Sequence, residues 1–400
     1  MDVKSKDSNS LESPYLTIDP RRTCPFDPPQ EFLEASETGM LVPWKFHAGH
    51  TGWLVTSNKL AKKILADSRF SVRADLAHTP NAPQLRHQLA PGLFHQMDAP
   101  DHTRLRSAVA SEFAPARMTE FAPVVYKIAE ECLENFKKQG PKSDFVKNVA
   151  HPFPLLVVCQ FLNIPKELSV KFIKQSAVVV NKSQSDDDRA VALRNVFEFL
   201  RPLMQQRTKN PQGDMLSRLV QHPELQLDEA VGIATQILIA GSMVPAAMLG
   251  YGLYAVLEKL DSLQEFSEGP NLNKAIEELL RYLSFESQPR IRVATKDVTI
   301  GNATILSGQL VAVALDAANR DGSVYLNPDS LDVNRDARGH LAFGWGPHQC
   351  LGRNLARLEL ATIFPLLNKY FPNLKLASDN VEIVDDGITR MVTQMQVQWQ

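Results

Sequence analysis

The chain has 400 residues, 44% hydrophobic and 22% charged, an ordinary globular composition with enough apolar side chains for a large core. Its net charge of -2 gives no reason to expect nucleic acid or an anionic membrane as a partner. The four cysteines are scattered without a Cys-x-x-Cys pair, so they indicate neither a zinc site nor a disulfide framework, and a reducing cytoplasm fits them.

The N-terminal end is polar and has the pattern of neither a signal peptide nor a membrane anchor. We expect residues 1–15 to form a disordered lead. Length alone would allow two or three domains. Because the chain shows no internal repeat and no linker rich in proline, glycine and serine, we expect residues 16–400 to form one domain.

Helical patterns dominate the first two thirds of the chain. An apolar strand at 53–56 precedes a short helix at 58–66, and Pro80, Pro83 and Pro91 then predict a long loop over a site. Further helices are expected at 102–113, 119–138, 145–162, 166–180, 189–206 and 214–221.

The segment 230–257 contains no charged residue, and more than about 18 such residues can form a membrane-spanning helix. Thr235, Gln236, Ser242, Pro245 and four glycines argue against a membrane span. We instead expect a buried helix that has Asp228 as its N-cap and runs to about residue 260. At about 1.5 Å per residue this helix would be roughly 50 Å long and would cross the molecule.

The last third of the chain combines a helix at 272–283 with short alternating runs at 291–293, 298–300 and 310–314, which predict a small sheet. The run 392–399 also alternates and predicts a strand. The fold class expected from these elements is mainly α with a small β part.

The stretch 343–353 places one cysteine in a loop of small and rigid residues directly before a helix. Its glycines let the backbone approach a flat object, and amides near the helix start can point toward a sulfur anion. A cysteine thiolate in this setting can ligate haem iron. A lone Gly-x-x-x-Cys would favour an ordinary buried cysteine, but the full spacing Phe343-x-x-Gly346-x-x-x-Cys350-x-Gly352 resembles the haem-binding signature of the cytochrome P450 family.

The resemblance runs from about residue 20 to the end, since the stretches 25–29 and 318–321 are also similar to the family. It implies the cytochrome P450 fold, with a long central helix over haem b and Cys350 as the iron ligand. Phe343, Gly346 and Gly352 would shape the cofactor loop. Bacterial members without an anchor take electrons from ferredoxin and its reductase, so Arg353 and Arg357 could form a docking face in a cytoplasmic enzyme.

Glu278 and Arg281 lie three residues apart on one face of the predicted helix at 272–283. Taken alone they would be a surface pair that contributes little to stability. They match the Glu-x-x-Arg pair of the family, and Arg335 matches its third partner. The resemblance therefore implies a buried Glu–Arg–Arg network that fixes the fold on the haem side.

Four basic residues match family contacts to the haem propionates: His102, Arg106, Arg292 and His348. His102 and Arg106 are four residues apart and share a helical face. Two carboxylates require cations or hydrogen-bond donors, and arginine binds carboxylates through two bonds. Each residue taken singly could instead be an ordinary surface cation.

The central helix departs from the family where it would cover the distal face of the haem. Ala240 and Gly241 match the family, but Met243 stands in place of an acid and Val244 in place of a threonine. Neither side chain can pass a proton. Pro245 lacks an N–H, so the Gly241 carbonyl loses its helix partner and a kink is expected. Simple apolar packing is the alternative explanation for this segment.

These departures favour an oxidative tailoring enzyme of natural-product biosynthesis, acting on a rigid, aromatic, nitrogen-containing small molecule by radical coupling, ring formation or substrate-assisted oxygen activation. The alternatives are an ordinary hydroxylase, a peroxide-using or nitric-oxide-reducing member, and a non-catalytic haem-binding accessory protein. By resemblance the substrate pocket includes the loop 74–94 and four candidate contacts: Gln288, Arg290, Ile388 and Thr389. Arg390 is a further candidate anchor.

Overall fold

The computed structural model describes residues 24–46, 51–73, 76, 91–165, 168–169, 172, 185–260, 262–283, 288–378, 380–385 and 390–399. The expected lead at 1–15, most of the loop 74–94 and most of the predicted helix 166–180 lie outside these residues. The candidate contacts Ile388 and Thr389 lie outside them as well.

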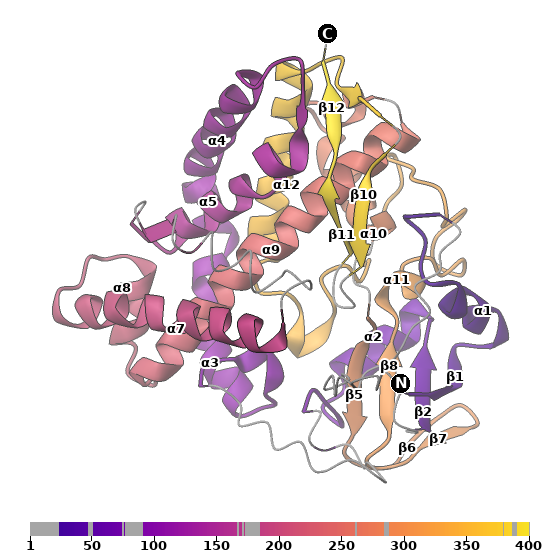
Figure 1. The fold of residues 1–400 in the computed structure, drawn as a ribbon. Coiled ribbons are helices and arrows are strands. Elements are labelled where there is room, and N and C mark those ends of the chain that lie inside the picture. Colours follow the sequence, from indigo (N-terminus) through magenta and orange to yellow (C-terminus); the bar gives the residue numbers. More distant parts are fainter. Residues whose placement is uncertain are drawn as a thin grey trace, which may run out of the picture.

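Helices make up most of the described fold, as Figure 1 shows. They are α1 (Gln30–Thr38), α2 (Asn58–Ala66), α3 (Asp101–Ala110), α4 (Pro115–Lys137), α5 (Pro152–Phe161), α7 (Asp186–Lys209), α8 (Met215–Gln221), α9 (Leu227–Lys259), α10 (Leu272–Leu283), α11 (Leu315–Ala318) and α12 (Arg353–Tyr370). Short 3₁₀ turns include η3 (Phe94–Gln96), η4 (Ser111–Phe113), η6 (Gln264–Phe266) and η7 (Gly346–His348), and η5 (Val146–Ala150) is a π turn.

The strands form several small sheets, and Figure 1 shows β1, β2, β5 and β8 together near α1 and α2, whereas β10, β11 and β12 lie in another part of the molecule. The strands are β1 (Leu41–Lys45), β2 (Thr51–Val55), β3 (Phe70–Ser71), β4 (Lys142–Asp144), β5 (Arg290–Ala294), β6 (Val298–Ile300), β7 (Ala303–Ile305), β8 (Leu310–Val313), β9 (Lys375–Leu376), β10 (Glu382–Asp385), β11 (Arg390–Gln394) and β12 (Gln396–Gln398). The predicted fold class, mainly α with a small β part, is confirmed.

The largest sheet has the order β1-β2-β8-β5-β3, in which only the β2–β8 pair is parallel. Leu54 and Val55 of β2 and all of β8 are buried, which explains why both strands have continuous apolar runs. β10 pairs with β11, β6 with β7, and β12 lies between β4 and β9. The run predicted as one strand at 392–399 is therefore split at Met395 between two sheets.

The 33-residue helix α9 runs through the middle of the molecule and packs against α5, α7, α8 and α10 (Figure 1). By length and composition it could cross a membrane, but 61% of its most apolar window is buried inside the protein. This burial is typical of a core helix, as the sequence predicted.

The start of α9 differs from the prediction that Asp228 is its N-cap. The N-cap is Gln226, whose backbone N–H donates to the Glu229 carboxylate at 2.9 Å in a capping box. Asp228 lies in the first turn and pairs with Arg201 of α7 at 2.5 Å. The predicted N-cap, Asp228, is therefore wrong by two positions. The helix starts earlier because the Glu229 carboxylate, at the third helical position, accepts from the Gln226 backbone N–H.

Candidate functional site

Cys350 stands at the end of a tight loop that begins at Phe343. The Cys350 N–H donates to the Phe343 carbonyl at 2.8 Å, which closes the loop directly before α12 begins at Arg353. Gly346 has φ +73°, and a Cβ there would come within 2.5 Å of the Leu65 carbonyl of α2. The sequence therefore needs glycine at this position to seat the loop on α2.

The cysteine side chains differ in environment. Cys350 is exposed, whereas Cys132 and Cys159 are buried among apolar residues. Burial raises the pKa of the Cys132 thiol to about 12 and also raises that of Cys159. Among the described cysteines, Cys350 combines an accessible sulfur with a following helix N-terminus, the setting in which a thiolate is favoured.

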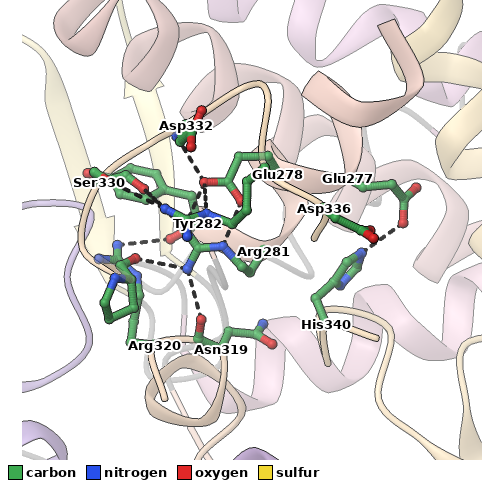
Figure 2. A network of polar contacts seen from close by, with 12 residues as sticks. Glu277, Glu278, Arg281, Tyr282, Asn319, Arg320, Ser330, Asp332, Asp336 and His340 are labelled. Carbon is green, nitrogen blue, oxygen red and sulfur yellow. Dashed lines mark hydrogen bonds and ion pairs between the residues drawn. The ribbon is translucent and has the colours of Figure 1, made fainter. Parts of the chain in front are cut away.

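The sequence-predicted residues Glu278, Arg281 and Arg335 lie in one network. Figure 2 labels Glu278 and Arg281 in it. Arg281 donates to the Glu278 carboxylate through Nε at 2.7 Å and Nη2 at 2.8 Å, and both side chains are completely buried. Arg335 donates from Nε to Glu278 Oε1 at 3.1 Å, and the Asp332 backbone N–H donates to the same oxygen at 2.9 Å.

Arg281 also connects α10 to the segment that precedes the cysteine loop. Its guanidinium donates to the carbonyls of Asn319, Pro328 and Ser330 at 2.8, 2.9 and 3.1 Å. A buried charge is stable only when its hydrogen-bonding groups are satisfied in this way. The network thus holds the segment that leads to the cysteine loop in place. It does so by charge-assisted hydrogen bonds to carbonyls of a segment that is neither helix nor strand.

A second network on α10, which the sequence did not reveal, joins Glu277 to His340 and Arg357. Arg357 Nε lies 2.5 Å from Glu277 Oε1, and His340 Nε2 lies 3.0 Å from Oε2 (Figure 2 shows the His340 contact). Burial opposes the charge of Glu277, but hydrogen bonds from Arg357 and His340 outweigh it and lower its pKa to about 2. Arg357 therefore has a partner within the chain, although it had been expected to contribute to a docking face.

The basic residues His102, Arg106, Arg292 and His348 gather near one another. The rings of His102 and His348 are 4.1 Å apart between centroids. Burial, followed by the nearby charges of His102, Arg292 and Arg106, lowers the pKa of His348 to about 3. Burial also lowers the pKa of Arg292 to about 10. Mutually repelling basic groups in partly buried positions are typical of an anion site.

These residues fit haem b. The buried Nε2 of His102 has no hydrogen-bond partner among the described residues, although a buried donor or acceptor normally has one. A propionate beside it would accept a hydrogen bond and offset the repulsion within the basic cluster. Cys350 supplies the sulfur ligand that haem iron accepts. The chain therefore offers a sulfur ligand for the haem iron and basic side chains for its propionates.

The middle of α9 has an accessible face although most of the helix is buried. Ala240 is exposed and Val244 is 41% exposed, and these residues are four apart on one side of the helix. Met243, beside them, is half-buried. These residues lie in the middle of the 33-residue helix, so this part of α9 is not covered by other described residues.

The residues of α9 next to this accessible face have contacts within the helix or with α5. Gly241 faces α5, because a Cβ there would come within 2.8 Å of the Val158 side chain, so its immediate role is close packing. Ser242 is buried and donates to the Ile239 carbonyl at 3.1 Å. Pro245 lies inside α9, which continues to Lys259.

The substrate candidates within the described residues differ in accessibility. Gln288 is half-buried and Arg290 is exposed at the start of β5. Arg390 is buried, donates to the Pro25 carbonyl and lies 5.7 Å from the Tyr251 ring centre. These contacts attach Arg390 to the N-terminal stretch and to α9, and its role as a substrate anchor stays a prediction.

Comparisons with known proteins agree with this geometry. The family model for cytochrome P450 matches residues 253–396. Cytochrome P450-SU2 of Streptomyces griseolus is 35% identical over 376 residues, covering 92% of this chain and 93% of the relative. The crystal structure of GfsF, a cytochrome P450 of Streptomyces halstedii, superposes with a TM-score of 0.88 at 31% identity, over 97% of this chain and 100% of that chain.

A third similar structure is described as the putative thioether synthase SgvP, involved in the tailoring step of griseoviridin. It superposes with a TM-score of 0.86 at 32% identity and covers 94% of this chain and 98% of that chain. Three structural features thus occur together in a chain with such relatives: an accessible cysteine, a cluster of basic groups and an accessible apolar face on the central helix.

Proposed function

This chain belongs to the cytochrome P450 family, and from that premise we propose that it is an oxidative tailoring enzyme that couples or cyclises a rigid, aromatic, nitrogen-containing substrate. As a family member it is an oxidoreductase of the monooxygenase type with a haem-thiolate cofactor. The proposal adds the reaction and the class of substrate, and it assigns a cytoplasmic location with ferredoxin and its reductase as electron donors.

The geometry of the cysteine loop and of the basic cluster supports the following cofactor-binding roles. Cys350 would ligate the iron, and His102, Arg106, Arg292 and His348 would bind the propionates of haem b. Phe343, Gly346 and Gly352 shape the loop that presents the sulfur. When bound, the haem supplies the activation of dioxygen and the oxidation of the substrate.

The observation that carries the proposal is the chemistry of the accessible face on α9. Ala240, Met243 and Val244 present only carbon and a thioether sulfur, so none of these side chains can give or take a proton. A hydroxylation that depends on proton delivery from this helix is disfavoured. A substrate that supplies its own N–H or O–H, and is oxidised at that group, depends less on proton-transferring side chains of the protein.

The proposed reaction balances without inserting oxygen. Two hydrogen atoms leave the substrate as a new bond forms between two of its atoms. Dioxygen, two electrons from ferredoxin and two protons complete the reaction by forming two waters with those hydrogens. The description of SgvP as a putative thioether synthase supports bond-forming chemistry on this scaffold, although those words describe that protein alone.

The deciding experiment uses purified haem-loaded protein. A reduced carbon-monoxide difference spectrum with the red-shifted thiolate band is expected, and its absence would favour a haem-binding accessory protein. Turnover with a ferredoxin system and a panel of indoles, cyclic dipeptides and phenols should give products that lack two hydrogen atoms. Tightly coupled hydroxylation of aliphatic substrates alone, with a gain of one oxygen atom, would overturn the proposed reaction.

A further inference from the structure

The helix α3 is attached on opposite faces to the cysteine loop and to the central helix. His102 and Arg106 share one face, whereas Arg104, two residues before Arg106, lies about 200° around the helix from it. The ring of His102 lies 4.1 Å from that of His348 in the cysteine loop. Arg106 Nη2 donates to the Gln349 carbonyl of the same loop at 2.7 Å. The other face, with Arg104, is turned to the start of α9.

Arg104 contacts α9 through both terminal nitrogens of its guanidinium. Nη2 lies 2.6 Å from Glu229 Oε1, and Nη1 donates to Glu229 Oε2 at 3.1 Å. Nη1 also donates to the Glu224 carbonyl at 2.7 Å, just before α9 begins. A guanidinium and a carboxylate joined by two bonds have a fixed relative orientation, which a single contact does not impose.

The Glu229 end of this pair is itself held in place. Its carboxylate accepts from the Gln226 N–H in the capping box of α9. Its carbonyl lies against Gly92, where a Cβ would come within 2.2 Å of the oxygen. A Cβ on Gly232 would come within 1.8 Å of the Pro91 carbonyl. The first turns of α9 are therefore in close contact with the chain that leads into α3, and the pair has a defined point of attachment on α9.

Packing of α3 does not by itself define its orientation toward α9. Within the described part of the chain, the backbone of α3 packs closely on the adjoining turns η3 and η4. Leu105 and Val109 bury the helix against the main core. Apolar burial is non-directional, whereas charge-assisted hydrogen bonds require a narrow geometry, so the ion pair adds the direction.

We propose that Arg104 and Glu229 are a positioning pair for the cofactor, which sets how α3 presents His102 and Arg106 to the haem propionates. The pair acts through α3, since Arg104 is on the face that points away from the cysteine loop. This inference rests on the haem-binding roles proposed above and adds two residues to them.

Substitutions can separate the ion pair from the helix cap. Glu229→Gln retains an acceptor for the Gln226 N–H, because glutamine also completes a capping box, but it removes the charge that binds Arg104. Arg104→Met removes the guanidinium and keeps a good helix former. In haem-loaded protein, we expect each to speed haem transfer to excess apomyoglobin about threefold, the size of a partly exposed ion pair, with Arg104→Lys between them and wild type.

The matched control is the neighbouring pair of Asp228 with Arg201, which joins the same turn of α9 to α7 at 2.5 Å. Asp228→Asn also removes one ion pair from this turn, but it should leave the transfer rate unchanged. Equal acceleration by Asp228→Asn would overturn the proposal, because a loosened start of α9 would then be the cause. An unchanged rate in Arg104→Met would overturn it as well.

A second comparison separates positioning from a general structural role. If Arg104 acts through Arg106, Arg104→Met should lose most of its effect on haem transfer in an Arg106→Gln background. The same threefold effect in both backgrounds would contradict the positioning role. A normal carbon-monoxide spectrum of wild type with any of the contrary results would leave the enzyme class intact, whereas a missing thiolate band would contradict the proposed function itself.

Discussion

The guanidinium carbon of Arg357 lies 4.6 Å from the centre of the Phe343 ring. The same guanidinium donates to Glu277 at 2.5 and 2.8 Å, so an ion pair on α10 and α12 fixes a cation over the first residue of the cysteine loop. His340, the other partner of Glu277, has its ring 5.9 Å from the Phe343 ring. Phe343 is therefore positioned from two sides.

Replacing Arg357 should loosen the loop that carries Cys350. Arg357→Gln removes the cation above Phe343 and one partner of Glu277, so we expect a lower Tm and a smaller fraction of the red-shifted carbon-monoxide band. Lys369→Gln is the control on the same helix, because Lys369 is exposed in the last turn of α12, at the opposite end from the cysteine loop. Equal effects of both substitutions would argue that general loss of positive charge is the cause.

Glu278→Gln should be one of the most destabilising single substitutions in the chain. It leaves Arg281 buried without its counter-charge, and removing one partner of a buried ion pair typically costs about 3–5 kcal/mol of unfolding free energy. Urea unfolding measures this change. Asp336→Asn, which removes an exposed pair with Arg338, is the control and should produce no measurable change.

The Glu277 network predicts a defined acid dependence of stability. The pKa of Glu277 is lowered from 4.5 to about 2 in the folded protein, so its ion pairs stabilise the fold fully above pH 4.5. This contribution is lost as the pH falls from 4.5 toward 2. The stability difference between wild type and Glu277→Gln should therefore be largest near neutral pH and shrink over that window in urea titrations. A difference that stays constant with pH would contradict the assigned ion pairs.

Arg292 should control how tightly the cofactor is bound. Arg292→Leu removes a buried cation from the basic cluster, and we expect haem to transfer to an excess of apomyoglobin about tenfold or more faster, as for the loss of one charge-assisted hydrogen bond. Arg292→Lys retains the charge without the planar fork and should be intermediate. Unchanged transfer rates in both variants would remove Arg292 from the propionate site.

Adding the missing acid and alcohol should change the products. In the double variant Met243→Asp with Val244→Thr, proton-carrying side chains occupy the accessible face of α9. We expect a larger share of products that contain one added oxygen atom, relative to products that lack two hydrogens. Mass spectrometry of the turnover mixture measures the ratio, and an unchanged ratio would show that this face does not direct the reaction.

Local signals in the sequence were sufficient for much of the fold. The helices at 58–66 and 272–283 and the strand at 298–300 have the predicted bounds, because their side-chain periodicity is set within a few residues. The spacing of Phe343, Gly346, Cys350 and Gly352 predicts a cofactor loop, and the tight loop that the structure has there is encoded in one continuous stretch.

Contacts between distant segments could not be predicted in this way. Glu277 was not distinguishable from any surface acid until α12 brought Arg357 to it across 80 residues. The contact between the stretch 91–92 and α9 gave no signal either, because it depends on the close approach of Gly92 and Gly232, which are far apart in the sequence. The sequence by itself determined many of the elements and the family, and it predicted Cys350 as the iron ligand, because these depend on neighbouring residues. Only the tertiary structure decided which polar groups meet around the site, because those partners are chosen by packing of the whole chain.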